Sequence, residues 1–253
     1  MLIDVHAHLD DAAYDQDREQ VIKEIKDKGM IVVNSASDLP TIASTFELAQ
    51  NNDFVYATLG VHPYEAAQVN EKELDKMAQL LSHPKVIGVG EIGLDYHMEN
   101  FDKKLQQKAF IDQLELANEY KMPVIVHDRD AHGDTMDILK KHMKVTGVMH
   151  CFSGSYEMAR QCLDMGMYIS IGGVLTFKNA RKTVEVIEKV PLERLLTETD
   201  CPYLTPEPYR GTRNKPVYVE YVVEKIAEIK GIDREEVERI VYQNVKRVFP
   251  KVR

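Results

Sequence analysis

The chain has 253 residues, of which 44% are hydrophobic and 29% charged, a balance that suits a globular protein with a substantial core. It contains no run of about 18 apolar residues and begins without a basic segment before an apolar stretch, so we expect a cytoplasmic protein that neither spans a membrane nor is secreted. The formal net charge of −9 argues against general affinity for polyanions, and three cysteines without C-x-x-C spacing argue against a disulfide framework or a zinc–cysteine site.

Strand-like and helix-like segments alternate along the whole chain. Short segments rich in Val and Ile predict buried parallel strands at 3–9, 30–35, 54–61, 85–94, 123–127, 147–152, 168–172 and 195–199. Helical periodicity follows at 17–29, 39–51, 71–82, 103–121, 135–142, 156–165 and 180–189, and then at 217–229 and 234–248. Asp233 and Glu236 have the spacing of a capping box at the start of the last helix.

Eight strand–helix units in succession predict an α/β fold, a TIM-type (β/α)8 barrel with an extra C-terminal helix. We expect residues 1–253 to form a single domain, because no change of composition marks a linker. A doubly wound open sheet is the alternative, since periodicity does not show closure.

Six side chains of metal-ligand type lie toward the carboxyl ends of the expected strands. His6 and His8 are two residues apart on the first strand, so both imidazoles point the same way. The others are Glu91, His127, His150 and Asp200. Each one alone is more often a buried hydrogen-bonding group or a helix cap, but barrel active sites lie at this end of the strands. Imidazoles suit transition metals and carboxylates can bridge two ions, so together the six predict a two-metal site.

Five separated segments carry a resemblance to a known family. LIDVHAHLD, GEIGLDYH, PVIVHDRD, HCFSGS and LLTETDCPYL resemble, in this order and spacing, the TatD family of metal-dependent hydrolases within the amidohydrolase-like barrels. The implied ligands are His6, His8, Glu91 and Asp200 for one divalent ion and Glu91, His127 and His150 for the second, with Glu91 as the bridge. The resemblance also implies metal-dependent deoxyribonuclease activity, including removal of nucleotides from the 3′ end.

A pair of metal ions is expected to activate a water molecule. Two cations about 3.5–4 Å apart lower the pKa of a shared water molecule toward neutrality, and the resulting hydroxide attacks the substrate. Asp200 is the expected proton acceptor, and Glu91 the catalytic bridge. The ions can be Mg²⁺, Mn²⁺ or Zn²⁺. Cys151 follows His150 and is expected to face the helix layer, away from the metals.

Substrate contacts are predicted from side chains on the same loops as the ligands. Arg129 lies two residues beyond His127 and can offer a fork to a phosphate. His62 ends the third strand, Arg210 and Arg213 lie in the Pro-rich loop after the eighth strand, and Tyr96 offers a ring for stacking on a base. Each is an ordinary solvated or structural side chain unless its loop covers the cleft.

Two functions fit the sequence. The first is a deoxyribonuclease that hydrolyses phosphodiester bonds from the 3′ end of single-stranded DNA, favoured by the basic side chains expected on the active-face loops. The alternative is a small-molecule hydrolase of an ester, lactone or amide, which calls for an enclosed apolar pocket. We expect DNA ends as the substrate and find no sign of an obligate protein partner.

Overall fold

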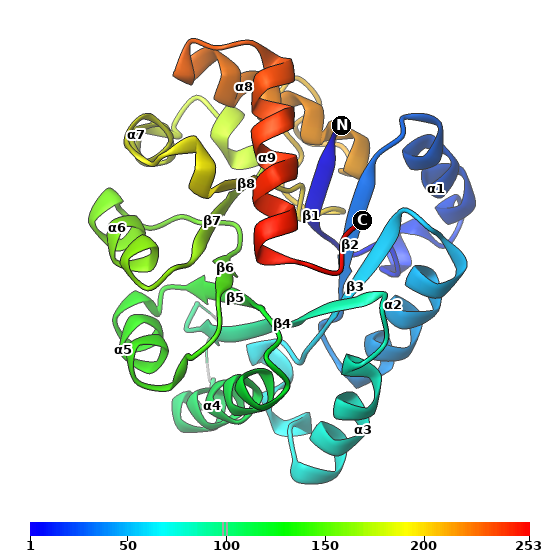
Figure 1. The fold of residues 1–253 in the computed structure, drawn as a ribbon, viewed down its shortest axis with the longest axis vertical. Helices are drawn as coiled ribbons and strands as arrows, with labels where there is room; N and C mark the ends of the chain where they lie inside the picture. Colours follow the sequence, from blue (N-terminus) through cyan, green and yellow to red (C-terminus); the bar gives the residue numbers. More distant parts are fainter. Residues whose placement is uncertain (98, 100) are drawn as a thin grey trace.

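The eight expected strands form one parallel sheet in which each strand pairs with the next along the chain, as seen in the computed structural model (Figure 1). The structure describes residues 1–97, 99 and 101–253. The strands are β1 (Ile3–Ala7), β2 (Ile31–Ser35), β3 (Val55–Leu59), β4 (Val86–Asp95), β5 (Val124–Arg129), β6 (Gly147–Met149), β7 (Tyr168–Ile171) and β8 (Leu195–Thr197).

The sheet closes on itself between its first and last strands. Ala7 forms a parallel bridge with Cys201, just beyond β8. The amide of His8 donates to the carbonyl of Cys201 at 2.9 Å, and the amide of Asp200 donates to the carbonyl of His6 at 3.0 Å. These bonds exclude the open-sheet alternative and confirm the TIM-type barrel.

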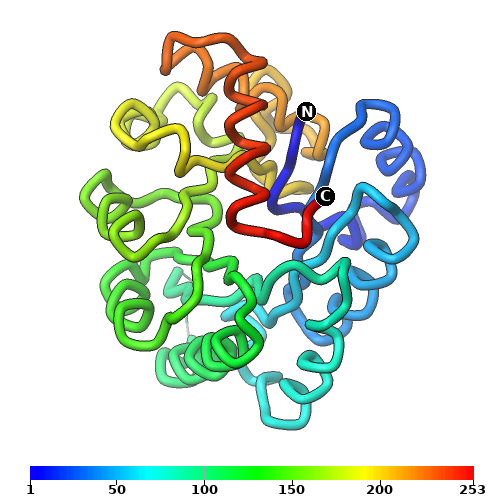
Figure 2. The backbone as a smooth tube through the Cα atoms, viewed as in Figure 1, coloured from blue at the N-terminus to red at the C-terminus, as the bar shows by residue number. Residues whose placement is uncertain are grey.

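Helices surround the barrel, and Figure 2 shows their coils following one another around the ring of strands. They are α1 (Arg18–Asp27), α2 (Leu39–Asn51), α3 (Glu71–Leu81), α4 (Lys103–Tyr120), α5 (His132–His142), α6 (Tyr156–Asp164), α7 (Arg181–Lys189), α8 (Val219–Lys230) and α9 (Arg234–Val248). Asp38, Asn70, Asp102 and Ser155 precede four of them and accept a first-turn N–H, which satisfies a donor the helix cannot pair itself. In the part of the chain that the structure describes, no helix is both long and apolar enough to cross a membrane.

The extra helix α9 covers the amino-terminal end of the barrel. The Asn244 amide donates to the carbonyls of Leu192 and Leu195, at 2.8 and 2.9 Å, beside the start of β8. Beyond α9 the Phe249 ring is fully buried, and Lys251 donates to the carbonyl of Val86 at the start of β4 at 2.8 Å. This end is therefore closed, and the opposite end is left for a site.

The expected capping box at the start of α9 does not form. The Asp233 side chain makes no capping hydrogen bond, because the backbone carbonyl of Asp233 accepts the Glu236 N–H at 3.1 Å.

Candidate metal centre

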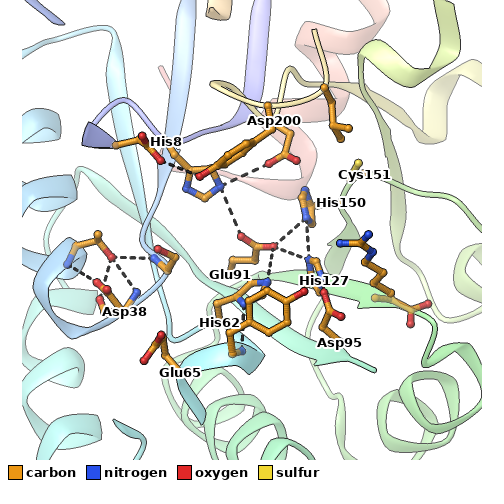
Figure 3. A pocket seen from close by; sticks show the side chains of 18 of the residues that line it. His8, Asp38, His62, Glu65, Glu91, Asp95, His127, His150, Cys151 and Asp200 are labelled. Atoms are coloured by element: carbon orange, nitrogen blue, oxygen red, sulfur yellow. Dashed lines mark hydrogen bonds and ion pairs between the residues drawn. The ribbon is translucent and has the colours of Figure 1, made fainter. Parts of the chain in front are cut away.

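All six predicted ligands lie together at the carboxyl end of the barrel. His6 is within β1, Glu91 within β4 and His127 within β5, whereas His8, His150 and Asp200 follow β1, β6 and β8. Figure 3 shows Glu91 in the middle, with His8 and Asp200 on one side and His127 and His150 on another.

One group of donor atoms gathers around Oε2 of Glu91. This oxygen lies 3.3 Å from Nε2 of His6 and 3.7 Å from Nε2 of His8, and the two nitrogens are 3.2 Å apart. Oδ1 of Asp200 lies 3.8 and 3.5 Å from the same nitrogens. Bonds of about 2.1 Å to a tetrahedral ion separate neighbouring ligand atoms by about 3.4 Å, so these distances match a four-ligand cation site.

A second group gathers around Oε1, the other oxygen of Glu91. Nδ1 of His127 lies 2.7 Å from Oε1, and Nε2 of His150 lies 2.9 Å from it. The two nitrogens are 3.4 Å apart. Glu91 therefore presents one oxygen to each group of imidazoles.

The other ring nitrogen of each of three histidines has a hydrogen-bonding partner, and for His8 and His127 this partner accepts the proton of the ring. Nδ1 of His8 donates to the carbonyl of Ser35 at 2.9 Å, which leaves Nε2 facing Asp200. Nε2 of His127 pairs with Oδ2 of Asp95 at 2.9 Å, which leaves Nδ1 facing Glu91. Nδ1 of His6 lies 3.1 Å from the Ser35 hydroxyl. Such outer partners orient metal-binding imidazoles.

Glu198 lies beside the fourth histidine, His150, although no pattern in the sequence marked it as a site residue. This carboxylate is fully buried, and its Oε1 accepts the Cys151 N–H at 2.5 Å and lies 3.4 Å from Nδ1 of His150. Glu198 lies two residues before Asp200, and that shared strand-end position was the available signal.

The donor set fits divalent cations. Burial disfavours the charged forms of both His150 and Glu91, yet Glu91 and Glu198 raise the pKa of His150 well above its usual range. Against the same burial, the imidazole of His150 holds the pKa of Glu91 well below its usual value. The buried carboxylate thus requires positive charge beside it. Four imidazoles and two carboxylates are the donors that zinc and related ions prefer.

His62 faces the same centre but is not placed as a ligand. Its Nδ1 accepts the Tyr64 N–H at 3.2 Å, so Nε2 carries the proton and lies 3.7 Å from Oε1 of Glu91. Burial lowers the pKa of His62 to about 3, so the ring is neutral at pH 7 and offers an N–H to the cleft. His62, Asp95 and His127 also lie close together, but Asp95 already accepts the His97 amide and pairs with His127.

A cleft of about 770 Å³ opens over the centre. Arg129, one of the predicted substrate contacts, lines the cleft and is exposed. Side chains that the sequence analysis did not identify line it as well, namely Tyr64, Tyr203, Leu204 and the carboxylates Asp10, Asp11, Asp38, Glu65 and Asp128. Tyr64 follows His62 by two residues and Tyr203 follows Asp200 by three, so proximity to predicted site residues was the only signal.

The structure does not bring Arg210, Arg213 or Tyr96 into this cleft. The Arg213 guanidinium binds both carboxylate oxygens of Asp17, at 2.7 and 2.5 Å. The Arg210 guanidinium lies 4.1 Å from the centre of the Phe177 ring. The two arginines of the loop after β8 therefore contact other side chains and do not line the cleft.

Tyr96 also contacts other side chains and does not line the cleft. Its ring stacks on Phe101 with the centroids 4.7 Å apart, and its hydroxyl donates to Asp134 at 2.8 Å.

The prediction that Cys151 faces the helix layer is wrong. Strand β6 ends at Met149, and Cys151 has a left-handed φ of 42°, so the alternation of side chains no longer holds there. Cys151 lines the cleft beside His150 (Figure 3).

A closed barrel with a carboxylate–imidazole centre at its carboxyl end is the arrangement of a metal-dependent hydrolase. The family model described as TatD related DNase matches residues 3–250, and the chain belongs to the TatD family.

Similar proteins cover nearly the whole chain. The chain is 47% identical to the uncharacterized metal-dependent hydrolase YabD of Bacillus subtilis over 98% of this chain and 99% of that protein. It is 38% identical to the uncharacterized metal-dependent hydrolase YcfH of Escherichia coli K12, over 98% and 95%. The crystal structure of YJJV, a TatD homologue from Escherichia coli K12, superposes with a TM-score of 0.92 at 32% identity, over 98% of both chains.

Proposed function

We propose that this hydrolase uses two divalent cations to remove nucleotides from the 3′ end of single-stranded DNA. The observation that carries the two-metal proposal is the position of Glu91, whose Oε2 faces His6 and His8 while its Oε1 faces His127 and His150. His6, His8, Glu91 and Asp200 would hold one ion, and Glu91, His127 and His150 the other.

When bound, two such cations polarise the phosphoryl group and lower the pKa of water. The chain supplies the proton acceptor. Burial opposes ionisation of Asp200, but the imidazole of His8 lowers the pKa of this carboxyl, so it is ionised near neutral pH. Asp200 takes the proton of the attacking water while the P–O3′ bond breaks, and the proton then passes to the leaving 3′ oxygen. The N–H of His62 donates to a substrate oxygen.

The choice of DNA rests on the family description and on the cleft. Arg129 lines the cleft, and the structure records no ion pair for it among the described residues, so its guanidinium is available for a phosphate. The carboxylates Asp10, Asp11, Asp38 and Glu65 line the same cleft and repel further phosphates. A short footprint of this kind suits a strand end more than the interior of a duplex.

One observation favours the alternative function. Carboxylates outnumber cationic side chains among the described residues that line the cleft, and this charge suits an uncharged ester, lactone or amide. The same hydrolytic centre serves both reactions, so a substrate comparison separates them.

The metal part is tested by elemental analysis of protein refilled with Mg²⁺, Mn²⁺ or Zn²⁺. We expect two ions per chain in the wild type and loss of the pair in Glu91→Ala, because the bridge is removed. Glu65→Ala is the matched control, since this carboxylate lines the cleft outside both ligand groups and should keep both ions. A wild type that never exceeds one ion per chain would show that the bridging assignment is wrong.

The substrate part is tested with metal-loaded enzyme on 3′-labelled and 5′-labelled single strands, beside a panel of esters and lactones. Stepwise shortening from the 3′ end supports the nuclease. Turnover confined to esters or lactones would replace it with the alternative.

A further inference from the structure

Two exposed tyrosines line the cleft on opposite sides of Glu91. Tyr64 is 42% and Tyr203 54% exposed, high values for large side chains with apolar rings. Tyr64 stands beside His62, which approaches Oε1 of Glu91, whereas Tyr203 stands beside His8, which approaches Oε2. The two rings therefore flank the place where the reacting bond must lie.

Tyr203 is held in place by its neighbours. Its hydroxyl donates to Oδ2 of Asp11 at 2.8 Å, and its ring lies edge-on to His8 with the centroids 6.4 Å apart. Leu204, 37% exposed, lines the cleft next to it. Tyr203 and Leu204 together form an apolar surface on the His8 side of the cleft.

Tyr64 is positioned from the other side. Its ring lies edge-on to His62, with the centroids 4.7 Å apart and the planes at 73°. Burial and then Asp95 raise the pKa of its phenol while Arg129 lowers it, and Tyr64 and Arg129 line the same cleft. A flat group stacked on Tyr64 would thus share the cleft with a phosphate bound by Arg129.

The charges around the cleft limit how much contacts with phosphates can contribute to the affinity for DNA. Among the described residues, Arg129 is the sole lysine or arginine that lines the cleft, and the carboxylates there repel a polyanion. Stacking on an aromatic ring does not depend on charge, and its loss weakens binding by about 5- to 100-fold per base.

From this arrangement we propose that Tyr64 and Tyr203 each stack one of the two bases flanking the scissile phosphodiester. The proposal deepens the nuclease function proposed above and rests on it. Stacking faces are free only in unpaired bases, so the two tyrosines select single-stranded ends and accept any base.

The test uses Mn²⁺-loaded enzyme and four single strands that are intact or carry a tetrahydrofuran abasic unit at the terminal position, the penultimate position or both. Tyr64→Ala and Tyr203→Ala are compared with the wild type, with Phe variants that keep the ring, and with Tyr120→Ala. Tyr120 is also 42% exposed but lies at the end of α4, outside the cleft. Circular dichroism checks that each variant is folded.

We expect each alanine variant to raise KM on the intact strand by about 5- to 100-fold. On the doubly abasic strand it should stay within about twofold of the wild type, because no base is left to stack. Each alanine variant should also become insensitive to an abasic unit at one position, whereas the Phe variants and Tyr120→Ala keep the wild-type pattern.

Binding without turnover gives a second readout. Strands with 2-aminopurine at either position should lose fluorescence on the Asp200→Asn enzyme, and each tyrosine-to-alanine change should abolish one of the two losses. An equal loss of activity on intact and doubly abasic strands, or a wild type indifferent to abasic units, overturns the stacking proposal while leaving the nuclease in place. A wild type that cuts none of the four strands rejects the nuclease function and the stacking with it.

Discussion

In the proposed mechanism Asp200 both binds a metal ion and accepts a proton, and a substitution at this single residue separates the two roles. Asp200 has a left-handed φ of 56°, which Asn also tolerates, so Asp200→Asn keeps the backbone and one oxygen donor but removes the proton acceptor. We expect the variant to retain much of the metal and to lose about 10²-fold or more in turnover. Elemental analysis and single-turnover kinetics measure the two effects.

The matched control is Asp38→Asn, which makes the same change at a carboxylate that lines the cleft and caps α2. Asn is an equally good cap, so this variant should be as stable as the wild type. Unchanged turnover in Asp200→Asn at full metal occupancy would move the proton acceptor to another residue.

Glu198 is predicted to act through His150. Glu198→Gln keeps an oxygen for the Cys151 N–H but removes the negative charge 3.4 Å from Nδ1 of His150. We expect metal affinity to fall by about 10- to 100-fold with the fold intact, the usual effect of losing a partner of a ligand histidine. Metal titration measures it, and Glu193→Gln, an exposed change of the same charge, is the control. Equal metal affinity in both variants would assign Glu198 to packing alone.

At the scale of elements, the spacing of β4 and β5 depends on Gly93. A Cβ at this position would lie 2.0 Å from the carbonyl oxygen of His127, and the φ of +148° is strained for any side chain. Gly93→Ala must therefore push the strands apart or rotate His127, and we expect it to lower the free energy of unfolding by at least about 2 kcal/mol.

Urea denaturation checks this against Gly133→Ala in α5, where an added Cβ meets nothing within 4 Å. The control should be neutral or stabilising by up to about 1 kcal/mol, because Ala restricts the unfolded chain more than Gly. Equal stability of the two variants would show that the strands separate without penalty.

The strands were predictable because their pattern is local, whereas the directions of the loops were not. The apolar run at 147–152 predicted one strand, yet β6 ends at Met149 and the left-handed Cys151 turns its side chain into the cleft. A single φ value decides that direction, and hydrophobic periodicity does not encode it. The predicted metal ligands do not depend on loop directions, because parallel strands bring their ends to one place whatever the loops do.

The arginines show a second feature that the sequence does not reveal, namely which charged side chains lie next to each other in the fold. Arg213 lies on the loop that was expected to bind phosphate, but it binds Asp17, a residue 196 positions away in the chain. Which carboxylate lies near an arginine depends on tertiary packing, so its availability for a ligand cannot be inferred from its loop. Arg129 has no such partner among the described residues, and its predicted place in the cleft agrees with the structure.

At the scale of the whole molecule, charge limits how much of a polyanion the enzyme can hold. The net charge is −9, and the cleft itself is lined by carboxylates. Long-range steering toward DNA is therefore unfavourable, and binding should depend on the two ions and Arg129. For single strands the logarithm of affinity falls with the logarithm of salt concentration by about 0.7 per neutralised phosphate. Contact with two or three phosphates thus predicts a slope of about −1.4 to −2.1.

Cleavage rate measured against salt, on linear single strands and on closed circular duplexes, tests this expectation. Arg129→Ala should reduce cleavage of phosphate substrates. It should also make the salt slope shallower by about 0.7, the contribution of one neutralised phosphate. Arg213→Ala removes the same charge outside the cleft and should leave both quantities unchanged. Efficient cutting of circular duplex, or a slope several times steeper, would require an extended phosphate-binding surface, which the acidic lining of the cleft opposes, and would contradict action at strand ends.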